Sequence, residues 1–530
     1  MEFIFIYYTT TADAFCQVPK KIFKNLPKTI EKCKDILYNY LELLCKGKLC
    51  PFHRPIFIEK RGNFMLNYKV KIGLVPERRF LPGPKRTGIF NPDYAVANKD
   101  RAVKYIKEHF ADAQTEFTDL EWLNDEGLLF LNEDVDKVAE YLRKEKVDAL
   151  FIMNCNFGNE EAAGRIAKEM GLPVLLWGPR DTIIEADGTR YTDSQCGLFA
   201  ISNQLRRAKI PFTYIENCLE TEAAFAEGLK KFISVVCMVK NFKRLEVVQV
   251  GVRLKPFKSV MSNEIELAEK FGINVTPVNL VETMQKLNFI YENRMDEIKA
   301  IADDVRANWQ VGDMDEDMLL RSCAFVLFYK EIFEEENASV ISTECWTAMR
   351  PGFGANPCLA MSILADMGYL VACESDIHGA ITTAMLSCAV RGKTPPFFGE
   401  FTCRHPSNDG AELLWHCGPF ARSLKAEDEV AGFDAIGRPS FRLANGHYTI
   451  GRFQNDGDVY RFFAKEFDTT EGPATIGTYL WADFGDMAKV ERKLIEGPYI
   501  HHMTEVKGGF ESVIREFCKY VPGLVYDTID

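Results

Sequence analysis

A strand–helix–strand segment over residues 338–376 constrains the fold of this chain more than any other part of the sequence. It opens with the run ASVISTE at residues 338–344, continues through a predicted helix at residues 355–368, and closes with the apolar run YLVACESD at residues 369–376. Two strands joined through a helix lie parallel in one sheet, because a parallel connection has to cross back over the sheet. The segment therefore predicts an α/β domain.

Each of the two predicted strands ends in a carboxylic acid, Glu344 on the first and Asp376 on the second. In open parallel sheets ligands bind outside the carboxyl ends of the strands, and two carboxylates there suit a divalent metal ion or acid–base chemistry. The alternative is that each acid only forms a turn or caps a helix N-terminus. The Gly- and Pro-rich segment MRPGFGANPC at residues 349–358 favours the first interpretation, since it is typical of a loop that lines a pocket.

The chain is too long for a single hydrophobic core, because it has 530 residues, of which 47% are hydrophobic. Strands and helices alternate over residues 65–241 and again over residues 242–370, the second range carrying Glu344. This alternation predicts two α/β domains with doubly wound, mostly parallel sheets. No dinucleotide or phosphate fingerprint accompanies it, so a nucleotide cofactor is not predicted.

The C-terminal part, residues 371–530, carries Asp376 and His502 and has a different pattern. From about residue 394 its short alternating runs are separated by Gly, Pro and aromatic residues. Such a pattern predicts a β-rich, barrel-like third domain.

The first 64 residues do not share the α/β pattern, which begins with the strand predicted at residues 68–75. Residues 1–64 contain four cysteines and many lysines, and they show no strand–helix alternation. We interpret them as an extension outside the main fold. Two explanations stay open: an upstream misreading of the start, with Met65 as the true initiator, or a genuine regulatory or packing segment.

Charge, hydropathy and cysteine usage exclude several classes of protein. The formal net charge is −12 and no basic stripe occurs, so nucleic acid is not an expected partner. No apolar run reaches the roughly eighteen residues of a membrane span. The 16 cysteines form no Cys-x-x-Cys pair, and Cys155, Cys237, Cys323 and Cys373 lie in apolar runs. Buried, reduced thiols of this kind predict a cytoplasmic protein.

Histidines are few, and the adjacent pair His501 and His502 stands out among the eight. Adjacent side chains on a strand point to opposite faces, so only one of the two can face a given site. One imidazole together with two carboxylates suits Mn²⁺, Mg²⁺ or Fe²⁺. A surface or core histidine with a backbone partner is the alternative for each residue.

Four short motifs resemble those of the L-fucose isomerase-like family, within the fucose/arabinose isomerase superfamily. They are STE at 342–344, ACESD at 372–376, WHCG at 415–418 and PYIHH at 498–502, and the resemblance covers residues 65–530. It implies two Rossmann-like domains, a C-terminal domain containing a β-barrel, and a homo-oligomer, often a hexamer.

The same resemblance implies a Mn²⁺ ion, or another divalent cation, held by Glu344, Asp376 and His502, whose side chains are expected to converge on one point. His502 matches the family histidine better than His501 does. The family has an asparagine–serine pair where this chain has His416 and Cys417. Three residues correspond to sugar contacts by this resemblance: His416, Tyr448 and Trp481.

The predicted function is a metal-dependent aldose–ketose isomerase that acts on an open-chain sugar, L-fucose or a related one, through an enediol. The ion would polarise the carbonyl, while Glu344 and Asp376 move the proton between C2 and C1 as base and acid, in an order that the sequence leaves open.

Two alternatives accompany this prediction. One is an isomerase of an anionic sugar such as sulfoquinovose, and the other is a non-catalytic sugar-binding protein on the same scaffold. An anionic substrate would need a cationic fork. The candidate arginines for it are Arg78, Arg79, Arg180, Arg350 and Arg404.

Removing residues 1–64 tests the interpretation of the extension. A chain that starts at Met65 should stay soluble and keep the activity of the full chain, because the α/β pattern begins after this point. Soluble yield and specific activity, measured beside the full-length protein, check this expectation. Loss of soluble protein on truncation would show that the first 64 residues belong to the fold.

Overall fold

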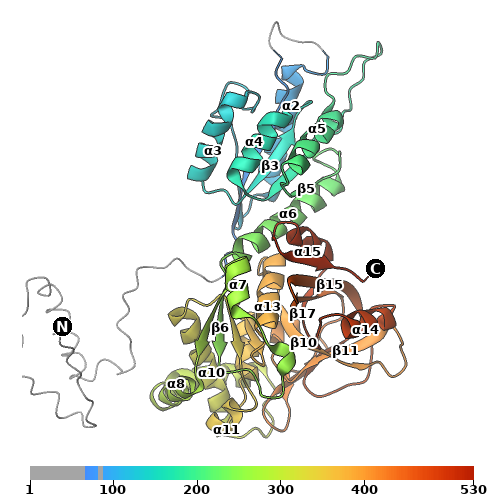
Figure 1. The fold of residues 1–530 in the computed structure, drawn as a ribbon. Helices are drawn as coiled ribbons and strands as arrows, with labels where there is room; N and C mark the ends of the chain where they lie inside the picture. Colours follow the sequence, from blue (N-terminus) through green and yellow to red (C-terminus); the bar gives the residue numbers. More distant parts are fainter. Residues whose placement is uncertain (1–65, 82–87, 530) are drawn as a thin grey trace, which may run out of the picture. The chain divides into compact units, whose positions relative to one another are not determined.

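The computed structural model describes residues 66–81 and 88–529, so the predicted extension at residues 1–64 lies outside the described part. Three sheets organise this part: a five-stranded sheet, a four-stranded sheet and a nine-stranded sheet (Figure 1). They follow one another along the chain in the order α/β, α/β, β-rich. The predicted mixed α/β class with parallel sheets and a C-terminal barrel is thereby confirmed.

The first sheet is parallel and has the strand order β2-β1-β3-β4-β5. Its strands are β1 (Val70–Glu77), β2 (Thr115–Thr118), β3 (Ala149–Asn154), β4 (Val174–Trp177) and β5 (Phe212–Tyr214). Every residue of β3 and β4 is buried, as expected for parallel strands covered on both faces. Order 2-1-3-4-5 is one of the common doubly wound arrangements.

Alternate residues of β3 enter different cores, and this alternation shows how the helices are divided between the two faces. Phe151 and Met153 join one core with α2 (Pro92–Phe110) and α6 (Ala223–Phe242). Leu150 and Ile152 join the cores on the other face. Those cores contain residues of α3 (Val135–Lys144), α4 (Glu160–Met170) and α5 (Ser194–Arg207).

The second sheet contains the predicted crossover unit. Its four parallel strands are ordered β7-β6-β8-β9. They are β6 (Glu246–Val250), β7 (Asn274–Val278), β8 (Val340–Thr343) and β9 (Val371–Cys373). The accompanying helices are α7 (Glu264–Phe271), α8 (Leu280–Asn293), α9 (Met295–Asn308), α10 (Glu316–Glu335), α11 (Met349–Phe353) and α12 (Cys358–Asp366). Strands β8 and β9 pair directly, with α11 and α12 between them in the chain; the domain boundary predicted at residue 370 falls just before β9.

Helix α13 (Ile377–Ala389) follows β9 and is buried along its whole length. Apart from His378 its side chains are small or apolar on every side, which is the pattern of a helix inside the core rather than on the surface. It contacts α6, β8, β14 and β17, so the last helix of the first α/β domain, the second sheet and the barrel meet around it. The helix begins at Asp376, whose carboxylate accepts a hydrogen bond from the backbone N–H of Gly379 at 2.9 Å.

Six strands of the C-terminal sheet close into a barrel. Pairing runs β16-β11-β10-β17-β14-β15, and β15 pairs back onto β16. The strands are β10 (Phe397–Arg404), β11 (Ala411–His416), β14 (His447–Asp456), β15 (Val459–Thr470), β16 (Thr478–Asp483) and β17 (His502–Lys507). The remaining elements are β12 (Gly432–Phe433), β13 (Pro439–Arg442), α14 (Met487–Glu496), α15 (Glu511–Cys518) and β18 (Leu524–Asp527).

The barrel register places three polar side chains near one another. Glu400 on β10 is opposite His502 on β17, and it is also opposite Trp415, the neighbour of His416 on β11.

None of the helices in the described ranges combines the length and hydropathy that a membrane-spanning segment requires.

Candidate active site

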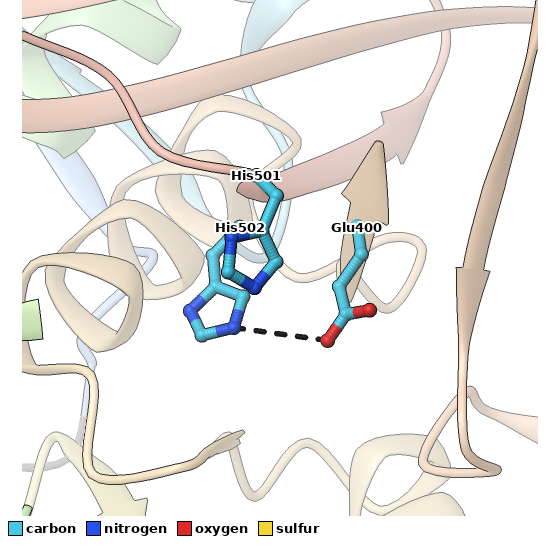
Figure 2. Close-up of side chains that lie close together, drawn as sticks. All are labelled: Glu400, His501 and His502. Atoms are coloured by element: carbon cyan, nitrogen blue, oxygen red, sulfur yellow. Dashed lines mark ion pairs between the residues drawn. The ribbon is translucent and has the colours of Figure 1, made fainter. Parts of the chain in front are cut away.

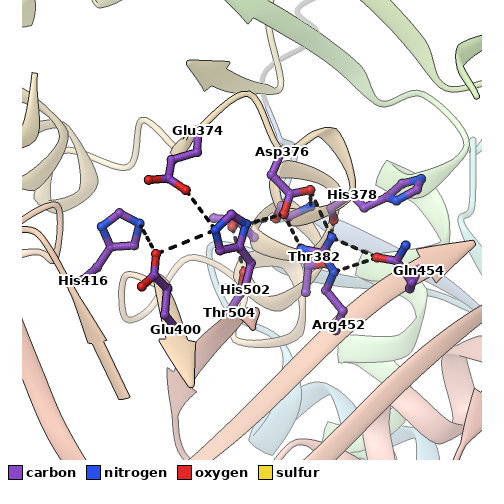
Figure 3. A network of polar contacts seen from close by, with 12 residues as sticks. Glu374, Asp376, His378, Thr382, Glu400, His416, Arg452, Gln454, His502 and Thr504 are labelled. Atoms are coloured by element: carbon purple, nitrogen blue, oxygen red, sulfur yellow. Dashed lines mark hydrogen bonds and ion pairs between the residues drawn. The ribbon is translucent and has the colours of Figure 1, made fainter. Parts of the chain in front are cut away.

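His502 lies at the centre of a buried polar network that joins the end of β9 to the barrel (Figure 3). Its Nδ1 is 2.9 Å from Oδ2 of Asp376. Its Nε2 is 3.0 Å from Oε2 of Glu374 and 3.7 Å from Oε1 of Glu400. The two ring nitrogens therefore face different carboxylates, Asp376 on one side and the Glu374–Glu400 pair on the other.

Asp376 is held by Arg452, and both side chains are completely buried. Nη1 of Arg452 is 2.5 Å from Oδ2 and Nη2 is 3.1 Å from Oδ1, while Gln454 accepts two hydrogen bonds from the same guanidinium. Burial alone would raise the pKa of Asp376, but the charge of Arg452 and the hydrogen bond from His502 outweigh it and hold that pKa well below its ordinary value.

The ionised Asp376 carboxylate determines how His502 can act. It accepts the Nδ1–H of the ring, so Nε2 is the nitrogen that remains available to a metal ion. Burial by itself lowers the pKa of His502, but the hydrogen bonds to Asp376 and Glu374 prevail and raise it. Without a metal, a proton on Nε2 donates a hydrogen bond to the Glu374 carboxylate. A divalent cation would take the place of that proton.

Glu374 reaches the site through an unusual backbone. Glu374 and Ser375 have φ angles of 63° and 55°, in the left-handed region that non-glycine residues seldom occupy. Ser375 is held there because its N–H donates to the Thr343 carbonyl at 3.0 Å and its Oγ donates to the Val252 carbonyl at 3.2 Å. Strain of this kind persists where the surrounding structure over-determines it, often at functional sites.

Glu400 is shared by two sets of side chains whose possible ligand atoms lie within 4.8 Å of one another. One set is Glu400, His501 and His502 (Figure 2), and the other is Glu374, Glu400 and His416. Burial raises the pKa of Glu400, although His416 and His502 oppose the increase. His416 is buried and its Nε2 has no hydrogen-bond partner, while its Nδ1 accepts the N–H of Cys417 at 2.8 Å. Burial lowers the pKa of His416, but the Cys417 sulfur and Glu400 outweigh it and raise that pKa to about 10. Nε2 therefore carries a proton, directed toward Glu400 at 3.7 Å.

The aromatic ring of Phe257 forms an apolar wall beside these groups. Its centroid lies 6.1 Å from that of His501, 6.0 Å from that of His502 and 6.1 Å from that of Trp346, in edge-on geometry. Arg253 holds the loop in place by donating to the Phe257 carbonyl at 3.0 Å. His501 and Trp346 are exposed, so this wall lies on the side of the site that faces solvent.

The charge balance fits a divalent cation. Within the described ranges, the ion pairs of Glu374 and Glu400 involve histidines alone, at distances of 3.0 and 3.7 Å. Two carboxylates and an imidazole without a permanent positive charge are a suitable donor set for Mn²⁺ or a similar ion. Glu374 and Glu400 from one of the two sets and His502 from the other are therefore the residues that could hold one, since His502 Nε2 lies near both carboxylates, with His501 and His416 beside them.

Of the predicted metal ligands, the structure brings Asp376 and His502 together, and it places Glu344 differently. Oε1 of Glu344 accepts from the N–H groups of Thr347 and Ala348, both at 2.9 Å, and from the Thr347 hydroxyl at 2.5 Å. Its Oε2 is buried without a hydrogen-bond partner. Glu344 belongs to neither potential ligand set among the described residues, and both Asp376 oxygens already have donors.

The predicted sugar contacts fall in two environments. His416 lies in the site, whereas Tyr448 is completely buried and donates its hydroxyl to the Ala444 carbonyl at 2.7 Å. Trp481 is also buried, and its Nε1 donates to the Pro473 carbonyl at 3.0 Å. Both aromatic residues are thus core residues of the barrel domain whose polar atoms are already satisfied.

Four of the arginines considered for anion binding are paired with glutamates: Arg78 with Glu126, Arg79 with Glu160, Arg180 with Glu222 and Arg404 with Glu491. The fifth, Arg350, is exposed on α11. Each of these four guanidinium groups is thus paired within the chain, although Nε of Arg79 is buried without a hydrogen-bond partner.

Sequence reasoning missed Glu374, Glu400 and Arg452. Glu374 stands two residues before Asp376 in the ACESD motif, so the motif contained the signal, but spacing did not show which acid faces the imidazole. Glu400 and Arg452 come from barrel strands, and only the β10–β17 register and the fold around α13 bring them close.

The comparisons with known proteins agree with the resemblance. Residues 84–243 match the family model described as fucose/sulfoquinovose isomerase, N-terminal domain. The chain is 26% identical over 382 residues to the sulfoquinovose isomerase of Alkalicoccus urumqiensis. The aligned region covers 70% of this chain and 83% of that protein.

Two further relatives carry the same name. The sulfoquinovose isomerase of Priestia aryabhattai is 25% identical over 344 residues, covering 63% of this chain and 74% of its own length. The sulfoquinovose isomerase of Clostridium sp. (strain MSTE9) is 27% identical over 290 residues, which cover 53% of this chain and 62% of that protein. The resemblance to the L-fucose isomerase-like family is thus confirmed.

Replacing Arg452 tests the network. Arg452→Met leaves the Asp376 carboxylate buried without its cation, so the free energy of unfolding should fall by about 3–5 kcal/mol at pH 7. The pKa of Asp376 in the folded protein lies below its unfolded value of about 3.9. The stability that the ionised carboxylate contributes is therefore present above that pH and is lost as pH falls. The free energies of unfolding of wild type and variant, measured in urea, should accordingly become more similar in acid.

Arg461→Met on β15 is the matched control, because Arg461 forms a partly exposed pair with Asp456 at 2.6 Å and should change stability by about 1 kcal/mol or less. Equal effects of the two substitutions would show that the Arg452–Asp376 pair has no special role.

Proposed function

We propose that this chain is a divalent-metal-dependent aldose–ketose isomerase whose substrate is an anionic sugar of the sulfoquinovose class. The observation that carries the proposal is the His502 ring, whose Nε2 is directed by Asp376 and Arg452 at the carboxylates of Glu374 and Glu400. The confirmed family resemblance supports an aldose–ketose isomerase rather than a sugar-binding protein without turnover.

We assign the metal site to Glu374, Glu400 and His502, with Mn²⁺ as the expected ion. A bound divalent ion would polarise the carbonyl of the open-chain sugar and make its C2 hydrogen more acidic. Asp376 orients His502 rather than binding the ion, because Arg452, Gly379 and His502 already occupy its oxygens. This assignment replaces the Glu344–Asp376–His502 ligand set with one that uses the neighbouring acid of the same motif.

Glu344 keeps its role in proton transfer in this proposal. Three donors fix its Oε1, while its buried Oε2 has no hydrogen-bond partner, so the carboxylate is oriented and one oxygen is available. Glu344 and Glu374 follow the paired residues Thr343 and Cys373 on adjacent strands, which puts both acids at the same sheet edge. His416 would donate its Nε2 proton to a substrate oxygen.

The preference for an anionic sugar rests on the three relatives described above, which carry the name sulfoquinovose isomerase, and not on the candidate arginines, four of which are paired with glutamates. L-Fucose, the neutral substrate first expected, has no comparable support. An oligomeric assembly and a cytoplasmic location remain expectations from the sequence.

A substrate and metal panel tests the proposal. Protein freed of metal by a chelator should be inactive, and Mn²⁺ should restore ketose formation from sulfoquinovose. The kcat/KM for sulfoquinovose should be about 10-fold or more higher than that for 6-deoxyglucose, its neutral counterpart. The reason is that a hydrogen bond to a charged group contributes about 1.5–3 kcal/mol. L-Fucose serves as the second neutral sugar. Activity that survives complete chelation, or a preference for the neutral sugars, would contradict the proposal.

Glu400→Gln provides the matched test of the metal assignment. Loss of one carboxylate charge should weaken Mn²⁺ binding, measured by calorimetry, by about 10-fold or more. Glu412→Gln is the control, because Glu412 is a buried acid on the adjacent strand β11 that belongs to neither potential ligand set in the described chain. Unchanged affinity in the Glu400 variant would remove this residue from the site.

Saturating metal separates proton transfer from metal binding. Glu344→Gln should keep a rate depressed by about 10²–10⁴-fold even at saturating Mn²⁺, because a positioned acid or base contributes about that factor. Asp376→Asn should also stay depressed, since it alters the His502 tautomer, and its folding is checked by thermal unfolding. Full rescue of both variants by Mn²⁺ would reduce the two acids to metal-binding roles. In D₂O, the proton-transfer route should place deuterium on the product carbon.

A further inference from the structure

Four cysteines lie along one side of the candidate active site, and they come in two close pairs. The Sγ atoms of Cys345 and Cys373 are 3.5 Å apart, and those of Cys358 and Cys417 are 3.8 Å apart. Cys345, Cys373 and Cys417 directly adjoin Glu344, Glu374 and His416 in the chain. Nothing in the proposed isomerase reaction uses these thiols.

The two pairs differ in access to solvent. Cys345 and Cys373 are both buried, whereas Cys417 in the other pair is partly exposed. Cys358 is buried behind Cys417 at the start of α12. Cys417 is therefore the residue of the four that an oxidant approaches from solvent. Its sulfur contacts the thiols of Cys358 and Cys373, and Cys373 is itself 3.5 Å from Cys345, which leaves Cys358 as the partner without a closer sulfur.

We propose that Cys358 and Cys417 form a reversible disulfide when the protein meets a hydroperoxide, which makes this pair an oxidative modification site beside the active site. The bond itself is independent of the proposed function, and only its effect on turnover rests on that function. The inference stands on the 3.8 Å separation of the two sulfurs, the partial exposure of residue Cys417 and its contact with His416.

The chemistry balances with hydrogen peroxide as the oxidant. The Cys417 sulfur attacks one peroxide oxygen and the O–O bond breaks. The thiol becomes a sulfenic acid, and the other oxygen leaves as water after taking up the thiol proton. The Cys358 sulfur then attacks the sulfur of that sulfenic acid, the S–O bond breaks, and a second water leaves as the S–S bond forms. Two electrons pass from the thiol pair to the peroxide, and a dithiol reductant reverses the change.

The disulfide would disturb His416. An S–S bond is about 2.05 Å long, so the two sulfurs have to approach by almost half their present separation. Cys417 holds the imidazole through its N–H, 2.8 Å from Nδ1, and its Sγ lies 3.2 Å from the same nitrogen. Movement of Cys417 toward Cys358 pulls both contacts away from the ring. Misplacement of a site group by about 1 Å can cost about 100-fold in rate.

Peptide mapping tests the bond directly. The full-length protein is treated with hydrogen peroxide, its free thiols are alkylated, and the digest is analysed by mass spectrometry. We expect a Cys358–Cys417 cross-linked peptide that disappears with dithiothreitol. We expect no such peptide from Cys358→Ser, in which dimedone should instead label the Cys417 sulfenic acid. A protein that forms only other cross-links, or in which Cys417 resists dimedone, would overturn the proposal.

Turnover gives the second readout. Peroxide should reduce the isomerase rate of the wild type by about 10- to 100-fold, and dithiothreitol should restore it. Cys403→Ser, which removes an exposed cysteine on β10, should respond as the wild type does. Cys358→Ser should not show the dithiothreitol-reversible loss. Because the cross-link is detected without any substrate, failure of the isomerase proposal would leave the mapping result intact, whereas a missing cross-link would defeat this inference alone.

Discussion

The completely buried ion pair between Arg452 and Asp376 is the interaction on which the site depends. Asp376 caps α13, binds the guanidinium from a barrel strand and accepts a hydrogen bond from the Nδ1–H of His502. A buried charge is tolerated only when it is paired and hydrogen-bonded, and here Arg452 and Gln454 meet that condition. One carboxylate thereby joins the core helix, the barrel and the orientation of the imidazole.

Two further constraints complete the arrangement. The left-handed backbone at Glu374 and Ser375 aims an acid at His502, and hydrogen bonds to the ends of neighbouring strands hold that backbone. The closed barrel sets the register that puts Glu400 opposite His502. The site therefore takes one acid from the edge of a parallel sheet, and another acid and the imidazole from barrel strands. Such a division explains why neither domain type alone would build it.

The sequence was sufficient for the parts of the fold that depend on local pattern. The crossover over β8 and β9 and the change to a barrel both follow from periodicity. The pairing of Asp376 with Arg452 did not follow from such patterns, because the two residues lie 76 positions apart in the chain. Tyr448 and Trp481 show the same limit: an aromatic residue in a polar motif can still be a core residue, and only packing decides.

The position of a bound metal tests the central claim most directly. Crystals grown with Mn²⁺ and measured at its absorption edge would locate the ion by anomalous scattering. The account predicts one peak within about 2.0–2.6 Å of His502 Nε2 and of carboxylate oxygens from Glu374 and Glu400, with Asp376 still bonded to Nδ1. A peak coordinated by the oxygens of Asp376, or by His501 with His502 turned away, would contradict it.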